Sequence, residues 1–234
     1  MKYLYATVFL MASVLSADFS PSYSQPSEQV AFAPVSSSKL ALFGVSNLSQ
    51  FVFKTDDIQG EGVFCLIRKE SSASAIDSVV GYTVEISLPI QSLKSGNPLM
   101  DADMHETLKA EEYAYIHYAL SSFEIEKQKA GKYGLRTFGM LTLAGVKNDV
   151  EMVVDIESLD GNRFRVRGQK TLRMTEFGIR PPAALGGLVK TKDQILIRFD
   201  VQAAPKKAIL ANTEQRNLIT DKDCNGNDTK KRGE

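Results

Sequence analysis

The chain has 234 residues, with 28 Lys and Arg against 28 Asp and Glu, so its formal net charge is zero. A neutral chain lacks the overall basic field that draws proteins to nucleic acids or to anionic membranes, so net charge gives no argument for either kind of partner. The length suits one all-β domain with a sizeable core.

The first residues are typical of a secretory signal peptide. Lys2 gives a minimal positive start, residues 3–15 are almost wholly apolar, and two small residues follow. This apolar run is shorter than the roughly 20 residues of a transmembrane span, and no later run approaches that length. We expect residues 1–24 to hold a signal peptide and the start of a linker, and 25–38 to be a flexible linker. The mature protein is then periplasmic or secreted.

From Lys39 onward, short apolar-rich runs alternate with turn residues, as they do in antiparallel sheets. One hairpin is expected to turn through residues 144–146. The stretch 175–190, with two prolines and three glycines, favours a loop or lid-like crossover over a central strand. The expected strands cover residues 39–46, 49–56, 59–68, 84–90, 115–120, 133–143, 147–157, 163–174 and 193–201.

About eight strands and one short helix predict an all-β antiparallel barrel or sandwich. A closed barrel is favoured because closure removes exposed strand edges. The helix is expected after Asn97 and Pro98, which suit an N-cap and a first helical turn. Met100, Met104 and Leu108 then form a narrow apolar stripe along it.

The same helix carries residues that could perform chemistry. Asp101 and His105 lie one turn apart with Asp103 nearby, which suits a metal or acid–base site. A transition metal usually needs three or four ligands, however, and the other histidine, His117, lies on a strand. Acidic residues also favour a helix N-terminus through the helix dipole. We give this structural role more weight and expect no catalytic residue, no metal and no cofactor.

Two cysteines leave two interpretations open. Cys65 lies in an apolar run and Cys224 in a polar tail. They are either a buried inert thiol and an unrelated tail cysteine, or a disulfide that tethers the tail. We expect residues 204–234 to form a polar, disordered C-terminal tail.

Three arginines alternate along one strand. Arg163, Arg165 and Arg167 share a face opposite Phe164 and Val166. We interpret that face as the barrel exterior, paired with acidic neighbours. The alternative is a contact with an anion or head group at a barrel rim.

Several short motifs resemble the YceI-like domain family. They are Ser92–Leu93, the run from Met100 to His105, and the Gly139–Val146 hairpin, followed by Phe177–Gly178–Ile179 before the final strand. The opening from Gly44 to Phe51 resembles a subset of the family. Together these motifs span about residues 39–203, and their order and spacing carry the resemblance more than any single motif does.

The resemblance implies a lipocalin-like antiparallel barrel with an elongated apolar cavity. Such a cavity would hold a polyisoprenoid, another isoprenoid or a different long-chain lipid. The resemblance implies binding without catalysis. Residues on the inward faces of the strands, with two from the helix, are then the expected lipid-binding set. They are Val84, Ile86, Leu88, Met104, Leu108, Ile116, Tyr118, Leu120, Leu141, Phe164, Val166, Phe177, Ile197 and Phe199.

The favoured hypothesis is therefore an exported, non-catalytic protein that binds a long-chain amphiphile within the barrel of residues 39–203. Periodicity leaves an alternative open, because a small barrel can also be filled by its own side chains. It would then be a structural or interaction module. A metal-assisted enzyme using Asp101, Asp103 and His105 is a third hypothesis with less weight.

Overall fold

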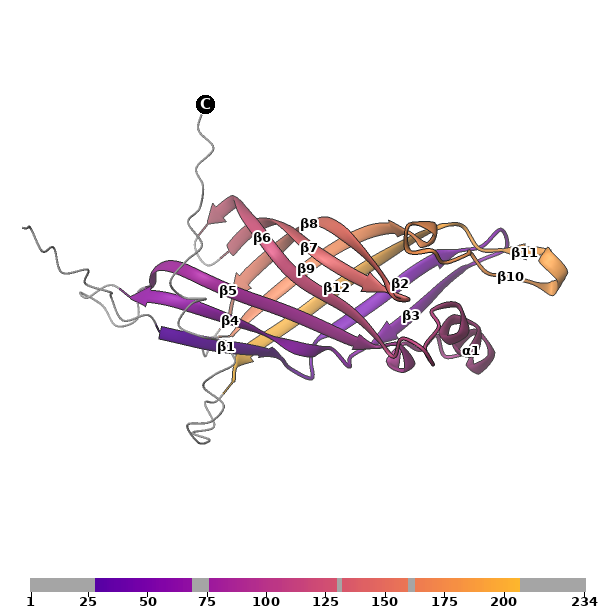
Figure 1. The fold of residues 1–234 in the computed structure, drawn as a ribbon, viewed down its shortest axis with the longest axis horizontal. Helices are drawn as coiled ribbons and strands as arrows, with labels where there is room; N and C mark the ends of the chain where they lie inside the picture. Colours follow the sequence, from indigo (N-terminus) through magenta and orange to yellow (C-terminus); the bar gives the residue numbers. More distant parts are fainter. Residues whose placement is uncertain (1–27, 69–75, 130–131, 160–162, 207–234) are drawn as a thin grey trace, which may run out of the picture.

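In the part of the chain that the structure describes, eight antiparallel strands close into a β-barrel, which confirms the expected fold (Figure 1). The computed structural model describes residues 28–68, 76–129, 132–159 and 163–206. Each strand pairs with the next around the ring, and the last pairs back onto the first. In ring order the strands are β1 (Glu28–Pro34), β4 (Gln59–Arg68), β5 (Ile76–Pro89), β6 (Tyr115–Lys129), β7 (Lys132–Leu143), β8 (Val146–Ser158), β9 (Phe164–Arg173) and β12 (Gln194–Pro205).

Alternate side chains on each strand point into the barrel, as the period of two requires. On β9, Leu172 is buried, whereas Gln169 and Thr171 are exposed. Residues that pair directly across antiparallel strands point to the same face. The register therefore carries the inner face around the ring, for example from Ile156 to Val166 and on to Val201.

A hairpin of β2 (Lys39–Val45) and β3 (Gln50–Thr55) continues the wall at one end of the barrel. β2 pairs with β12 beside the stretch where β12 meets β1. On its other side, β3 is joined to the segment after β5 by two backbone hydrogen bonds between Lys54 and Lys94, of 2.8 and 2.9 Å. We call this end, which also carries the helix, the helix end.

The helix α1 (Pro98–Thr107) begins where the sequence predicts. The Oδ1 of Asn97 accepts hydrogen bonds from the backbone N–H groups of Leu99 and Met100, at 3.0 and 3.4 Å. Before α1, the chain forms the short 3₁₀ helix η1 (Ile90–Ser92). Ile90 in this helix and Leu93 directly after it are both completely buried. These two apolar anchors fix the segment from which α1 extends across the barrel end.

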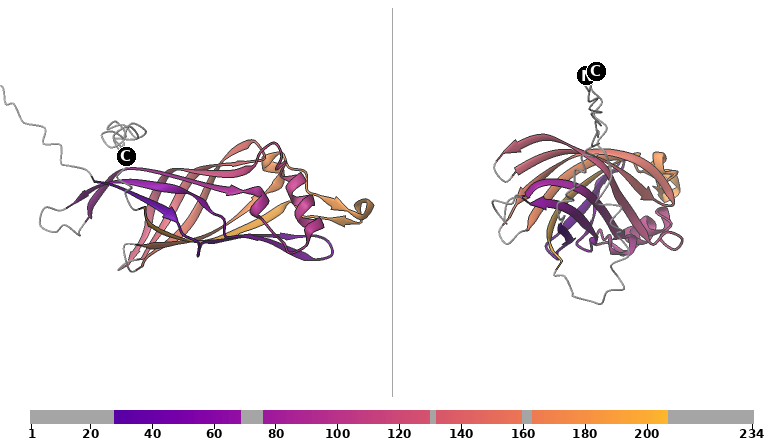
Figure 2. Two further views of the ribbon diagram at one scale, coloured as in Figure 1. Left: turned by 90° about the horizontal axis from the view of Figure 1, so that it is seen from below. Right: turned by 60° about the vertical axis from the view of Figure 1, so that its left-hand side comes forward.

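The crossover from β9 to β12 lies beside α1 at the same end. It contains η2 (Met174–Phe177), the two-residue strands β10 (Ala183–Ala184) and β11 (Val189–Lys190), and η3 (Leu185–Gly187) between them. β10 and β11 pair only with each other and project past the barrel (Figure 2). The expected absence of a central strand in residues 175–190 is therefore confirmed within the described residues. Phe177, only 2% exposed, anchors the crossover in the core.

The start of the barrel differs from the expected linker over 25–38, because residues 28–34 form β1. Local sequence gave little sign of this strand, which is short and ends at a proline. Its stability comes from tertiary packing, since the Phe32 ring lies 4.8 Å from that of Phe164. The expected signal peptide, most of the C-terminal tail and Cys224 lie outside the described residues, so the pairing of Cys65 and Cys224 stays open.

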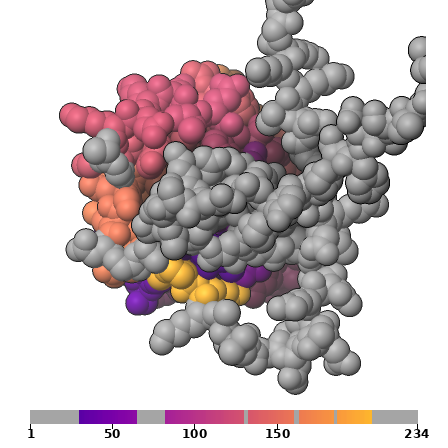
Figure 3. Space-filling view, turned by 90° about the vertical axis from the view of Figure 1, so that its left-hand side faces the viewer, coloured from indigo at the N-terminus to yellow at the C-terminus, as the bar shows by residue number. Residues whose placement is uncertain are grey.

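The ring does not pair along its full length. β8 pairs with β9 only from Val154 to Ser158, and toward the helix end the two ladders part. At the opposite end β5 and β6 part in the same way, since they pair only from Glu85 to Pro89. Figure 3 looks at that opposite end, where pink residues of β6 and yellow residues of β12 lie on opposite sides of the barrel. Neither the β5–β6 ladder nor the β8–β9 ladder thus runs the full length of its strands.

Candidate functional site: an apolar cavity at the helix end

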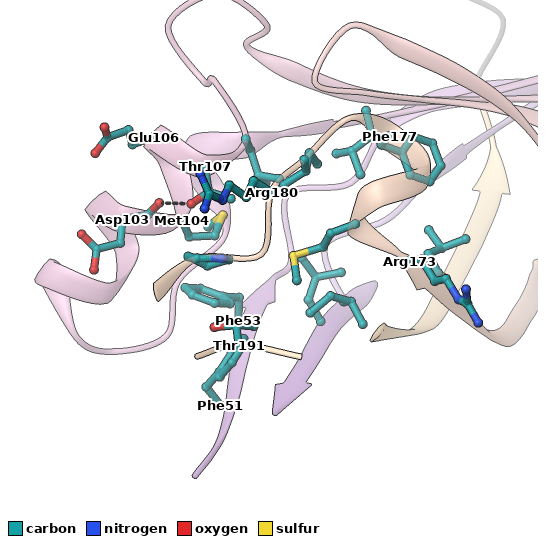
Figure 4. A pocket seen from close by; sticks show the side chains of 18 of the residues that line it. Phe51, Phe53, Asp103, Met104, Glu106, Thr107, Arg173, Phe177, Arg180 and Thr191 are labelled. Carbon is teal, nitrogen blue, oxygen red and sulfur yellow. Dashed lines mark hydrogen bonds between the residues drawn. The ribbon is translucent and has the colours of Figure 1, made fainter. Parts of the chain in front are cut away.

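A cavity of about 890 Å³ occupies the helix end of the barrel. Its walls come from the β2–β3 hairpin, α1, the crossover and the neighbouring ends of the barrel strands (Figure 4). The volume falls within the range of about 300–1,000 Å³ that is usual for small-molecule sites. The apolar side chains that surround it from β2, β3 and β12 are Leu42, Phe51, Phe53, Ile195 and Ile197.

Six of the sequence-predicted lipid-binding residues line this cavity. Met104 and Leu108 reach it from α1, and Phe177 reaches it from the crossover. The other three lie on the inner faces of β6, β7 and β12 and are Ile116, Leu141 and Ile197. The structure thus brings together residues that are up to 93 positions apart in the sequence (104 to 197).

The other eight predicted residues lie on the barrel strands but outside the cavity lining. Five of them belong to β5 and β6 and are Val84, Ile86, Leu88, Tyr118 and Leu120. The remaining three, Phe164, Val166 and Phe199, belong to β9 and β12. All are half-buried except Leu88, which is buried.

The inner side chains away from the helix end pack against one another through aromatic rings. Phe32 meets Phe64 and Phe164, with ring centroids 6.0 and 4.8 Å apart. Tyr82 and Phe123 form a second pair at 4.9 Å. Such pairs add about 0.5–1.5 kcal/mol each beyond the area they bury. The lumen therefore has an open half at the helix end, which we call the cavity half, and an aromatic half at the other end.

Two rings lie flat on the barrel wall where the halves meet. A Cβ at Gly139 would come within 2.6 Å of the Tyr118 ring, and one at Gly168 within 2.5 Å of the Phe199 ring. Ile116 and Ile197, the next inner residues toward the helix end, line the cavity, whereas Tyr118 and Phe199 do not. These rings thus stand at the inner boundary of the cavity, which we call its floor.

Tyr118 also brings a polar group to the floor. Its hydroxyl is buried and has no hydrogen-bond partner of regular geometry. Burial raises the pKa of Tyr118, and the nearby Thr137 side chain only partly offsets this. The Thr137 hydroxyl itself donates to the carbonyl of Met152, at 3.0 Å. The boundary therefore contains a buried hydroxyl beside Thr137 in an otherwise apolar setting.

Charged side chains of both signs surround the cavity mouth. Asp103 and Glu106 come from α1, and Lys109 follows its end. Arg173 and Arg180 come from β9 and the crossover, and Arg180 extends toward α1 (Figure 4). An apolar cavity with a charged rim suits an amphiphile rather than a fully polar ligand.

The helix residues considered for chemistry differ in exposure and in hydrogen bonding. Asp101 is buried, and its Oδ1 accepts hydrogen bonds from the Ser95 hydroxyl and backbone N–H, at 2.6 and 2.7 Å. The Ser95 hydroxyl bond is the main reason that the pKa of Asp101 is lowered. Asp103 is exposed, and the Nε2 of His105 is buried without a partner. Among the described residues, no three His, Cys, Asp or Glu side chains gather as metal ligands would.

The outward arginines pair with acidic residues, as the sequence indicates. Arg165 donates to both carboxylate oxygens of Asp200, through Nε at 2.6 Å and through an NH2 group. Arg167 pairs with Glu157 at 3.0 Å. Both contacts lie on the outer face of β9, away from the cavity.

Sequence reasoning missed the part of the cavity that the β2–β3 hairpin and the crossover supply. Phe51 and Phe53 alternate along β3, and Ile179 is 4% exposed. Alternation in residues 49–56 and the Phe177–Gly178–Ile179 motif were the available signals. They did not show that these distant segments converge on one end of the barrel.

Comparisons with known proteins agree with this architecture. A model of the YceI-like domain matches residues 33–203. The chain is similar in structure to a polyisoprenoid-binding domain from Saccharophagus degradans implicated in plant cell wall breakdown. Identity is 10% and the TM-score 0.57, with 76% of this chain and 100% of that chain covered. It is also similar to BcnA of Burkholderia cenocepacia, at 13% identity and a TM-score of 0.54, with 71% and 96% covered. No curated protein matches the chain.

At these low identities the two solved structures support the fold alone. The match to the family model supports membership of the family. None of the helices in the described residues is long and apolar enough to cross a membrane. The matched range begins within β1, ends within β12 and contains every residue that lines the cavity. The chain therefore belongs to the YceI-like domain family.

Proposed function

We propose that the protein binds a long-chain amphiphile, such as a polyisoprenoid, with its apolar chain in the cavity half, and that it does so without catalysis. The observation that carries this proposal is an apolar cavity of about 890 Å³ with a charged rim. Each methylene that leaves water contributes about 0.8 kcal/mol, so a long chain can bind tightly without specific polar contacts. A structural relative that is described as polyisoprenoid-binding supports the same class of ligand.

The first test is recovery of the natural ligand. Protein purified from a lysate that contains membranes is analysed by native mass spectrometry and by organic extraction. Bound long-chain lipid is the expected result. Recovery of empty protein that also fails to take up added polyprenol or fatty alcohol would contradict the proposal and favour a structural or interaction module.

A matched pair of variants locates the binding site. Met104→Trp places a larger side chain at a residue that lines the cavity from α1, whereas Leu99→Trp alters a residue of the same helix that is 78% exposed. We expect the first to weaken binding of a fluorescent lipid about tenfold, through the cost of overpacking, and the second to leave it unchanged. Equal binding by both variants would place the ligand elsewhere.

We also propose that the protein is exported to the periplasm or secreted. The support is the sequence of residues 1–17, with its short apolar run after Lys2. N-terminal sequencing of protein from its native host should show a mature chain that begins after the apolar run. A mature chain that still carries residues 1–15 and stays in the cytoplasmic fraction would contradict export.

A further inference from the structure

A single lysine occupies an inward position on β9. Lys170 pairs in register with Ile197 of β12, and Ile197 lines the cavity. On its own strand it shares a face with Leu172 and Gly168, whereas Gln169 and Thr171 on either side are exposed. Its side chain, which is half-buried, therefore starts from the inner wall of the barrel.

Lys170 stands at the floor of the cavity. The next inner residue toward the helix end, Leu172, lines the cavity. The next in the other direction, Gly168, is covered by the Phe199 ring. Lys170 is outside the cavity lining and starts one inner position beyond Leu172, so its flexible side chain begins next to the cavity.

No described residue neutralises this charge. Within the described part of the chain, the side chain of Lys170 forms neither a hydrogen bond nor an ion pair. Its inner-face neighbours Gly168, Leu172 and Ile197 are all uncharged. By contrast, the nearby Arg165 and Arg167 on the outer face both have acidic partners. A half-buried ammonium without a counter-ion is available to a bound anion, and a charge-assisted hydrogen bond between the two is among the stronger polar contacts.

We propose that Lys170 binds the carboxylate of a long-chain carboxylic acid, which enters the cavity head-first and leaves its chain among the apolar walls toward the helix end. This inference rests on the proposed function and adds the class and orientation of the ligand. One ammonium neutralises one carboxylate fully, whereas a phosphate monoester would keep further buried charge.

The rival arrangement places the acid at the mouth, against Arg180. The two arrangements are separated by a matched ligand pair, a saturated fatty acid and the fatty alcohol of equal chain length, titrated at neutral pH against four proteins. These are the wild type, Lys170→Met, Arg180→Met and Lys147→Met. Lys147 is an exposed lysine on β8 and serves as the control. Thermal unfolding checks that each variant is folded, and Lys170→Arg tests whether a positive charge is sufficient.

We expect the wild type to prefer the acid over the alcohol by about tenfold to a hundredfold, the range for a hydrogen bond to a charged group. Lys170→Met should abolish this preference and leave the alcohol bound as before, and Lys170→Arg should restore part of it. Arg180→Met and Lys147→Met should keep it. Acid, but not alcohol, should also protect the Lys170 amine from acylation by a water-soluble reagent, as peptide mass mapping would show.

Other results overturn the inference in distinguishable ways. Equal binding of acid and alcohol by the wild type removes the role of Lys170 but leaves the proposed function intact. Loss of the preference in Arg180→Met alone places the head group at the mouth. Failure of both ligands to bind the folded wild type contradicts the proposed function itself.

Discussion

The two halves of the lumen arise from the same alternating strands but differ in what fills them. In the aromatic half, Phe32, Phe64 and Phe164 pack against one another across the strands. In the cavity half, the inner residues are separated by space, because α1, the crossover and the β2–β3 hairpin extend the wall beyond the closed ring. The comparison shows that an inward position does not decide between core and binding site. The two halves differ in whether large rings from nearby strands contact one another along the inner wall.

The largest effect is expected where the cavity half meets the core. Phe177 is 2% exposed and anchors the crossover. Phe177→Ala should lower the free energy of unfolding by about 3–5 kcal/mol, because it removes a fully buried ring and leaves a void. Urea denaturation measures this loss. A change below about 1 kcal/mol would mean that the crossover is not held by this ring.

A smaller loss is expected at the boundary between the halves. Gly139→Ala places a Cβ within 2.6 Å of both the Tyr118 ring and the backbone oxygen of Ala119. Because the backbone oxygen cannot move aside easily, we expect a destabilisation of about 1–3 kcal/mol in the same assay. Gly134→Ala on the same strand is the control, since its Cβ would meet only Lys127 at an ordinary 3.4 Å. Equal effects of the two variants would argue against a ring that lies on Gly139.

The boundary can also be tested through ligand length. Phe164→Ala removes a ring of the aromatic half and should lengthen the usable lumen. In a series of fatty alcohols, the chain length at which affinity stops rising should increase, with about 0.8 kcal/mol gained for each further methylene that is buried. Isothermal titration calorimetry on the wild type and the variant measures this limit. An unchanged limit would show that Tyr118 and Phe199 close the floor without help from the aromatic half.

The smallest effect concerns acid stability at the helix end. Hydrogen bonds from Ser95 lower the pKa of Asp101 in the folded protein. This stabilisation is present above the ordinary aspartate pKa of about 3.9 and is lost as the pH falls through the lower folded value. The stability difference between wild type and Asp101→Asn should therefore be largest at neutral pH and shrink on acidification. A difference that stays constant between neutral pH and about pH 2 would contradict this assignment.

Local signals predicted the elements that local interactions stabilise. The cap at Asn97 and the hairpin turn at Ala144–Gly145 lie where the sequence placed them. Both turn residues have a positive φ, 47° and 79°, as a tight two-residue turn requires. β1 was missed because its residues are held by rings from distant strands rather than by a strong pattern of their own.

The site was predicted only in part for the same physical reason. Alternation predicts which residues of a strand point into the barrel. The position of a residue along the barrel axis, however, depends on the register between strands. Hence Ile116 lines the cavity, whereas Leu120, on the same strand, does not. Lys170 was overlooked because the arginines at 163, 165 and 167 dominate the charge pattern of that strand. Counting on by two from Val166 reaches Lys170 and places it on the inner face.

The parting of β8 and β9 has a consequence for kinetics. Along the cavity half, the wall between these strands lacks the continuous ladder that joins β6 to β7, so fewer hydrogen bonds must break for the wall to open there. Opening of this seam needs no unfolding of the barrel. The time that a ligand stays bound can then be governed by local opening of the wall between β8 and β9 rather than by the global stability of the fold. A barrel built in this way can combine high stability with fast exchange of what its cavity holds.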